Sequence, residues 1–117
     1  MRVLVVDDEP VFRRAARALL ERRGHVVVGE AGSASEAEAA VGQLSPDALL
    51  LDVRLGDASG FDVAYALTRA YPKLAVLLVS ADVEEASCHE RAAASGARGI
   101  RLKSELAGVD LDAFWSS

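Results

Sequence analysis

Five short apolar runs recur along the chain, separated by segments with helical periodicity. The runs are rich in Val, Leu and Ile, and they are continuous rather than alternating. This pattern predicts strands that are buried on both faces, as in a parallel sheet. In order, the predicted strands are Val3–Val6, His25–Gly29, Ala48–Leu51, Ala75–Val79 and Gly99–Leu102.

A helix is predicted after each strand. Between Pro10 and Gly24, apolar side chains recur at the i, i+3, i+4 spacing of an amphipathic helix. Ser33 and Glu36 have capping-box spacing at the start of the second helix. The remaining helices are predicted over Phe61–Tyr71, Val83–Ser95 and Glu105–Trp115.

Strict alternation of strands and helices predicts an α/β fold, with an open parallel sheet covered by helices on both faces. Five such β/α units fill the 117 residues, so residues 1–117 are predicted to form one domain. If the strand order is 2-1-3-4-5, the first and third strands are central neighbours and the second strand is an edge.

Composition limits the partners and the compartment. The formal charge of −5 argues against nucleic acid or an anionic membrane as the direct partner of this domain. The one cysteine, Cys88, has no internal disulfide partner, which favours a reducing, cytoplasmic location. The longest apolar run falls well short of the roughly 20 residues that span a bilayer.

Polar residues follow four of the five predicted strands. The first strand is followed by Asp7 and Asp8, the third by Asp52, the fourth by Ser80 and the fifth by Lys103. In an open parallel sheet, function collects at the carboxyl ends of the strands. Three carboxylates, a hydroxyl and an ammonium are therefore predicted to share one rim.

Each residue type has a chemical task at such a rim. Neighbouring carboxylates repel one another unless a cation neutralises them, and Mg²⁺ prefers oxygen ligands. A carboxylate beside the metal can attack phosphorus and form an acyl phosphate. The Lys103 ammonium and the Ser80 hydroxyl would then stabilise charge on the phosphoryl oxygens.

From residue 3 to about residue 115, the chain resembles the receiver domain of response regulators in two-component signalling. The matching segments are VLVVDDEP at 3–10, LLLDVRL at 49–55, VSA at 79–81 and LKS at 102–104. Each segment is a weak match alone, but four in the right order at the right strand ends are specific. The resemblance implies a flavodoxin-like (βα)5 doubly wound parallel sheet with strand order 2-1-3-4-5.

The resemblance also implies the signalling role. Asp52 would accept a phosphoryl group from a sensor histidine kinase or a phosphotransfer protein, Lys103 would contact that group, and Ser80 would hydrogen-bond to it. The signal would pass to an output domain or a downstream protein. The domain would catalyse only its own phosphorylation and dephosphorylation, so it is not predicted to be an enzyme.

The metal in this family is Mg²⁺, and the resemblance implies its ligands. Asp8 would bind the ion directly and Asp7 through water, at the acceptor Asp52. The backbone carbonyl of Arg54 would complete the protein's share of the coordination.

Three positions depart from the family pattern, and one of them is Gly56, which stands where a proline is common in the turn after the acceptor. Ser104 replaces the proline that usually follows the lysine, where a cis bond would cost about 2.5–4 kcal/mol, so this bond is either trans or held cis by the site. Ile100 replaces a Tyr or Phe that usually swings inward on phosphorylation. Isoleucine cannot act as an aromatic rotamer switch, so the output half of the mechanism is open while the acceptor half is intact.

Two alternatives remain at this point. A receiver-like interaction module that acts without phosphorylation is favoured by Ile100 and Ser104 but disfavoured by intact Asp52 and Lys103. An aspartyl phosphotransferase or phosphatase of the haloacid-dehalogenase type would place its nucleophile after the first strand, in an Asp-x-Asp pattern that this chain lacks. A homodimer is also possible, although the acidic fourth helix discourages a symmetric contact there.

Overall fold

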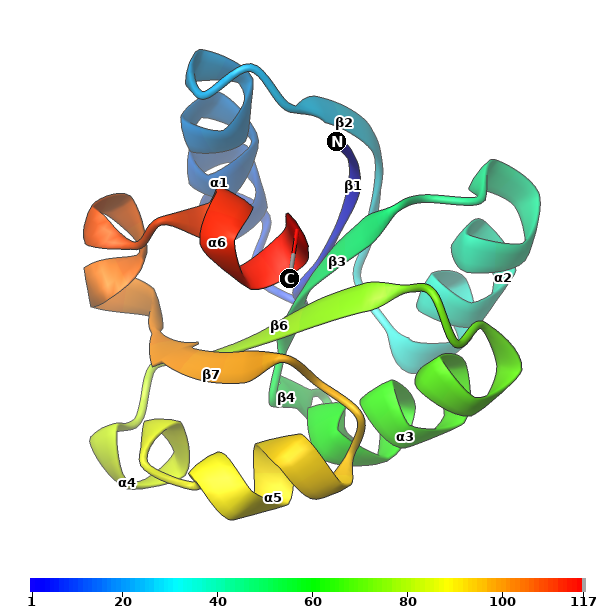
Figure 1. Ribbon diagram of the computed structural model, residues 1–117, viewed down its shortest axis with the longest axis vertical. Coiled ribbons are helices and arrows are strands. Elements are labelled where there is room, and N and C mark those ends of the chain that lie inside the picture. The colour runs from blue at the N-terminus through cyan, green and yellow to red at the C-terminus, as the bar shows by residue number, and fades with distance from the viewer. Residues whose placement is uncertain (117) are drawn as a thin grey trace.

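A parallel sheet of five strands forms the middle of the molecule, as the computed structural model shows for residues 1–116 (Figure 1). All neighbouring strands in it are parallel. Their order is β2-β1-β3-β6-β7, which confirms the predicted order 2-1-3-4-5 when the strands of this sheet are numbered consecutively. In chain order they are β1 (Arg2–Val6), β2 (Val26–Ala31), β3 (Ala48–Asp52), β6 (Ala75–Ser80) and β7 (Gly99–Leu102).

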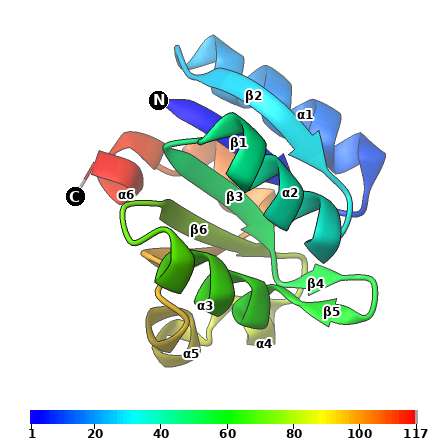
Figure 2. The ribbon, with the colours of Figure 1, turned by 90° about the vertical axis from the view of Figure 1, so that its right-hand side faces the viewer.

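Helices cover both faces of the sheet, which confirms the doubly wound α/β architecture. One face packs against α1 (Pro10–Arg22) and α6 (Leu111–Ser116), and the other against α2 (Ala34–Leu44), α3 (Gly60–Ala70) and α5 (His89–Ala94). Figure 2 shows α2 and α3 in front of the sheet and α1 behind it. None of the helices described is long and apolar enough to cross a membrane.

The side chains of β1 show why a continuous apolar run makes a central strand. Leu4 and Val6 belong to the core on the side of α2 and α3, whereas Val3 and Val5 belong to the core on the side of α1 and α6. All four are at most 1% exposed. Because successive side chains of a strand point to opposite faces, a strand between two helical layers needs apolar residues throughout.

Local signals set the ends of the first two helices as predicted. Pro10 occupies the first turn of α1, and Gly24 follows its end with a φ of +85°. The Ser33 hydroxyl accepts a hydrogen bond from the N–H of Glu36 at 3.2 Å. The Glu36 carboxylate reaches back to the N–H of Gly32 at 2.7 Å, one residue earlier than in a standard capping box.

The predicted single helix Val83–Ser95 is wrong. Two short helices occupy this segment, α4 (Val83–Ala86) and α5, with Ser87 and Cys88 between them. The Ser87 hydroxyl donates to the carbonyl oxygen of Val83 at 2.9 Å, a side-chain bond that bends or ends helices. In addition, α4 buries none of its side chains, so no packing holds the helix straight through this point.

The predicted helix Glu105–Trp115 is also wrong as one element. The chain forms a 3₁₀ helix, η1 (Lys103–Gly108), and then the separate α6. The carboxylate of Asp110 accepts a hydrogen bond from the N–H of Ala113 at 3.2 Å and so caps α6. The break lets α6 turn back onto the sheet, where Trp115 is only 2% exposed.

A short hairpin follows β3 and was not predicted. It pairs β4 (Arg54–Leu55) with β5 (Ala58–Ser59), and Gly56 in the connection has a φ of +60°. Strands of two residues are too short to leave a hydrophobic pattern, so only the turn residues mark this hairpin in the sequence.

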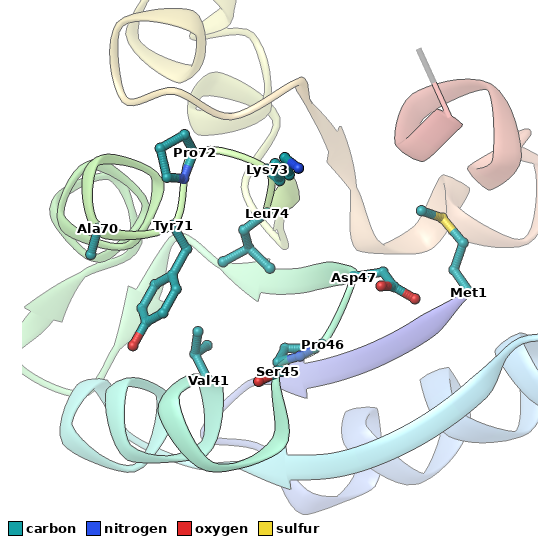
Figure 3. A pocket seen from close by; sticks show the side chains of 10 residues that line it. All are labelled: Met1, Val41, Ser45, Pro46, Asp47, Ala70, Tyr71, Pro72, Lys73 and Leu74. Atoms are coloured by element: carbon teal, nitrogen blue, oxygen red, sulfur yellow. The ribbon is translucent and has the colours of Figure 1, made fainter.

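A pocket of about 570 Å³ opens at the amino ends of the strands (Figure 3). Its lining is mainly apolar and includes Val41, Tyr71 and Leu74. The charged residues Asp47 and Lys73 also line it. None of the predicted site residues lines this pocket. The predicted chemistry lies at the opposite, carboxyl edge of the sheet.

The start of α3 packs directly on the backbone of Asp52 and Val53, and a substitution at Gly60 tests this close approach. A Cβ at Gly60 would lie 2.6 Å from the Cα of Val53 and closer still to the carbonyl oxygen of Asp52. We expect Gly60→Ala to lower the free energy of unfolding by about 2–3 kcal/mol, because backbone atoms must move apart.

Urea denaturation measures this effect, and Gly108→Ala is the matched control, since a Cβ at Gly108 has open space around it. A Gly60→Ala protein as stable as Gly108→Ala would contradict the close packing of α3 on this strand.

Candidate functional site

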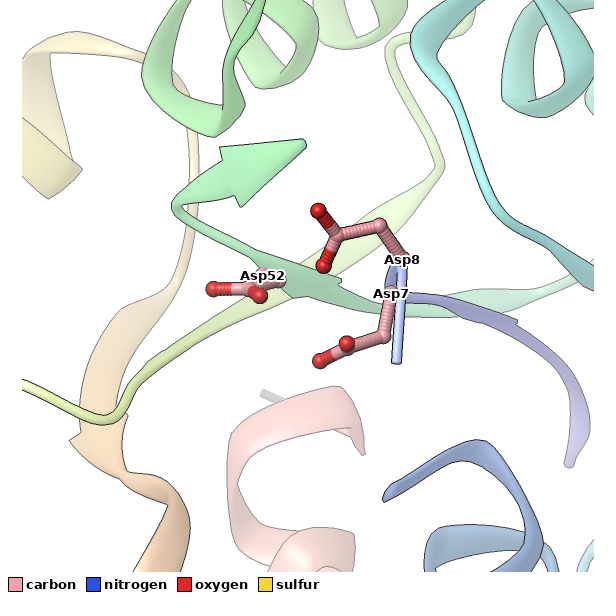
Figure 4. A group of neighbouring side chains, drawn as sticks. All are labelled: Asp7, Asp8 and Asp52. Atoms are coloured by element: carbon pink, nitrogen blue, oxygen red, sulfur yellow. The ribbon is translucent and has the colours of Figure 1, made fainter. Parts of the chain in front are cut away.

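Three carboxylates meet where β1 and β3 end (Figure 4). Asp7, Asp8 and Asp52 each offer an oxygen, and these oxygens lie within 4.8 Å of one another. Asp7 is fully buried and Asp52 is 5% exposed, whereas Asp8 is exposed. Buried carboxylates this close repel one another, so their ionised forms require positive charge nearby.

The ammonium of Lys103 supplies part of that charge. Its Nζ lies 2.7 Å from a carboxylate oxygen of Asp7, 3.1 Å from one of Asp52 and 3.4 Å from one of Glu9. It also lies 4.5 Å from the centre of the Phe12 ring. Burial alone would lower the pKa of Lys103, but the hydrogen bonds and charges of Asp7 and Asp52 outweigh burial and leave this pKa raised.

For the carboxyl of Asp52, burial outweighs the neighbouring positive charge. Its burial, followed by the charge of Asp7, raises the pKa of Asp52 to about 6, although the backbone N–H of Arg54 and the ammonium of Lys103 both act to lower it. The N–H of Arg54 donates to Oδ1 of Asp52 at 3.1 Å. This bond fixes the orientation of the carboxylate, while Oδ2 lies against Lys103.

The remaining donor set fits a hard divalent cation. Oδ1 of Asp7 is taken by the N–H of Glu9 at 2.8 Å, and Oδ2 of Asp8 by the N–H of Gly56 at 3.1 Å. Oδ2 of Asp7 is buried, and it pairs with the ammonium of Lys103 at 2.7 Å. Three carboxylates beside the single charge of Lys103 leave an excess of negative charge on oxygen atoms, which suits Mg²⁺, an ion that prefers oxygen ligands.

Ser80 ends β6 and is fully buried, and its hydroxyl bonds to Asp82 and Glu85. It donates to a carboxylate oxygen of Glu85 at 2.9 Å and contacts the carbonyl oxygen of Asp82 at 3.2 Å. Within the residues described, no hydrogen bond joins Ser80 to Asp52. The structure therefore places Ser80 at the predicted strand end, with its hydroxyl on the side of α4.

Ile100 and Ser104, two positions that depart from the family pattern, lie in β7 and directly after Lys103. Ile100 is fully buried, and its backbone pairs with Leu78 in the sheet. Residues 1–116 contain no cis peptide bond, so the Lys103–Ser104 bond is trans.

Two acidic residues at the site were not singled out from the sequence. Glu9 contacts Lys103, and its place directly after Asp7-Asp8 was the available signal. Glu85 bonds to both Ser80 and Arg54, and it belongs to the short helix that follows β6. Because that helix was predicted to continue to Ser95, the direction of the Glu85 side chain could not be read from the pattern.

The family profile of the response regulator receiver domain matches residues 3–108. Among curated relatives, the DNA-binding transcriptional activator DevR/DosR of Mycobacterium tuberculosis is 36% identical over 112 residues, which cover 95% of this chain and 51% of that protein. The first relatives that match are longer than this chain, which spans 22% to 51% of their lengths.

Solved structures agree with this match. The signal receiver domain of the putative response regulator NarL from Mycobacterium tuberculosis has a TM-score of 0.79 and 35% identity, with 96% of this chain and 94% of that chain covered. A response regulator from Burkholderia pseudomallei, solved with a phosphorylated aspartic acid, calcium ion and citrate, has a TM-score of 0.82 and 27% identity. There the match covers 97% of this chain and 65% of that chain. By its sequence and its fold, the chain belongs to the response regulator receiver domain family of two-component systems.

Proposed function

We propose that this domain accepts a phosphoryl group on Asp52 in the presence of Mg²⁺. The observation that carries the proposal is the group of Asp7, Asp8 and Asp52, with Asp7 and Asp52 buried, against the ammonium of Lys103. The relative from Burkholderia pseudomallei, which carries a phosphorylated aspartic acid and a calcium ion, supports it. The donor is the phosphohistidine of a sensor histidine kinase or of a phosphotransfer protein.

Asp7, Asp8, Asp52 and the backbone carbonyl of Arg54 would hold the Mg²⁺. The bound ion supplies positive charge for the phosphoryl oxygens during transfer. The close approach of the three carboxylates supports this assignment, and the carbonyl of Arg54 follows from the family pattern.

In the transfer step, a carboxylate oxygen of Asp52 forms a bond to phosphorus as the P–N bond of the donor breaks. The electron pair of that bond stays on the nitrogen, and the imidazole leaves neutral when its other ring nitrogen carries a proton. The N–H of Arg54 orients the attacking carboxylate at 3.1 Å. The ammonium of Lys103, now paired with Asp7 and Asp52, can follow the negative charge onto the phosphoryl oxygens.

Hydrolysis of the acyl phosphate by water would end the signal. The domain would turn over no free substrate, so it would act as a cytoplasmic signalling module rather than as an enzyme. Output would pass to an output domain or a partner protein, and relatives named as transcriptional regulators support this. The domain itself would bind neither nucleic acid nor membrane, consistent with its net charge of −5.

The proposal predicts a covalent adduct at a single residue. After incubation with Mg²⁺ and acetyl phosphate, intact mass spectrometry should show the wild-type chain heavier by one phosphoryl group. The adduct should be absent from Asp52→Asn and present in Asp57→Asn, because Asp57 is an exposed aspartate five residues further along. A folded wild-type protein that takes no phosphoryl from acetyl phosphate or phosphoramidate would favour the interaction module instead.

The charge cluster also predicts an unusual effect on stability. In the presence of a chelator at about pH 7.5, Asp52→Asn should be more stable than the wild type by on the order of 1–3 kcal/mol, because the raised pKa of Asp52 makes its ionised form costly. The pKa of this group in the folded state lies above its value in the unfolded chain. The wild type therefore gains stability as the pH falls through about 6, and the gap should close.

Urea denaturation at several pH values measures this difference. Excess Mg²⁺ should narrow or reverse it, because binding to the native state stabilises the wild type. An Asp52→Asn protein that is less stable than the wild type in chelator at neutral pH would contradict the charge repulsion described here.

A further inference from the structure

A continuous polar chain runs from the acceptor loop to α4. Ser80, at the end of β6, donates to one oxygen of Glu85 at 2.9 Å. The other oxygen of Glu85 accepts from Nε of Arg54 at 2.7 Å. Arg54 in turn belongs to the loop that follows Asp52 and donates its backbone N–H to that carboxylate. Glu85 of α4 is thus linked to the end of β6 through Ser80 and to the segment after the acceptor Asp52 through Arg54.

These bonds matter because α4 has little else to hold it. Its four residues bury no side chain, and Val83 is 65% exposed. The Glu85 side chain, by contrast, is only 25% exposed. Burial would raise the pKa of Glu85, but the hydrogen bonds from Arg54 and Ser80 outweigh burial and lower it. The carboxylate is therefore ionised, and both bonds to it are charge-assisted.

The hydroxyl of Ser80 has a single proton to donate. It cannot bond strongly to Glu85 and to a phosphoryl oxygen on Asp52 at the same time. A phosphoryl group would also add negative charge beside the loop that carries Arg54, whose guanidinium pairs with Glu85 at 2.7 Å and lies 3.9 Å from Asp82. Phosphorylation and the contact with Glu85 thus compete for the one proton of Ser80.

We propose that Ser80, Glu85 and Arg54 form a latch that holds α4 in the resting state and opens when Asp52 is phosphorylated. The inference rests on the proposed function, since it assumes a phosphoryl group at Asp52. It supplies a polar route for the response in a chain where Ile100 is buried and apolar and cannot act as an aromatic switch. Glu85 is then a positioning residue that acts through Ser80.

The chain carries its own reporter of the position of α4. Cys88, its one cysteine, lies two residues after α4 and is partly buried against the core on that side. The rate at which a thiol reagent labels Cys88 in the folded full chain should rise when α4 is released. Mg²⁺ with beryllium fluoride serves as the phosphoryl analogue, and calorimetry measures its binding.

The test compares Glu85→Ala with Glu84→Ala. Both variants remove one negative charge from α4, but the contacts described for Glu84 involve its backbone rather than its carboxylate. Without the analogue, Glu85→Ala should label on the order of tenfold faster than wild type, since it loses two charge-assisted hydrogen bonds, and Glu84→Ala should label at the wild-type rate. Glu85→Gln, which keeps an oxygen for Ser80 but loses the charge opposite Arg54, should be intermediate.

With the analogue, the labelling of wild type should accelerate towards the rate of Glu85→Ala, and that variant should change little. By linkage, Glu85→Ala should also bind the analogue several-fold more tightly, about 5- to 10-fold. If wild type binds the analogue but Glu85→Ala labels and binds as wild type does, the latch is wrong and the proposed function stands. If wild type does not bind the analogue at all, the proposed function fails and the latch falls with it.

Discussion

The contact between one buried ammonium and two buried carboxylates organises this molecule. Lys103 lies within about 3 Å of both Asp7 and Asp52, although burial opposes the charge of Lys103 and of Asp52. A sheet covered on both faces can hold such a cluster, because its central strands place the side chains and the surrounding core offsets the cost of burying them. The parallel order explains why residues so far apart in sequence meet: β1, β3 and β7 all end at this edge.

The same edge divides into a rigid part and a loose part. Asp7 directly follows β1 and Asp52 ends β3. The neighbouring side chains of both strands are buried, so packing fixes the positions of these two carboxylates. Ser80 also ends such a strand, but its partner Glu85 lies on a helix that contributes nothing to the core. The core holds the strands beside Asp52 in place, but it does not hold α4. Under the proposed function, we therefore expect a change of charge at Asp52 to displace α4 rather than the strands.

The sequence was sufficient for the sheet and for the residues at its edge, because both depend on burial patterns and strand ends. It failed where side chains compete with the backbone. Ser87 bonds back to Val83 and ends α4, and Asp110 caps a new helix, whereas the apolar spacing alone favoured uninterrupted helices. The role of Glu85 was hidden for the same reason, since its direction follows from where α4 ends and from the long side chain of Arg54 reaching across from the β4–β5 hairpin.

Under the proposed function, Ile100 bears on how a signal leaves the acceptor site rather than on the chemistry there. An aromatic ring at this position would link the acceptor edge to the outer face of β7, but a fully buried isoleucine beside Leu78 has no polar atom and no reason to leave the core. Among the residues described, the polar path away from Asp52 instead runs through Arg54 and Glu85 to Ser80. Because the Ser80 hydroxyl has one proton to donate, to Glu85 or to a phosphoryl oxygen, that path has two exclusive arrangements, which is the requirement for a switch.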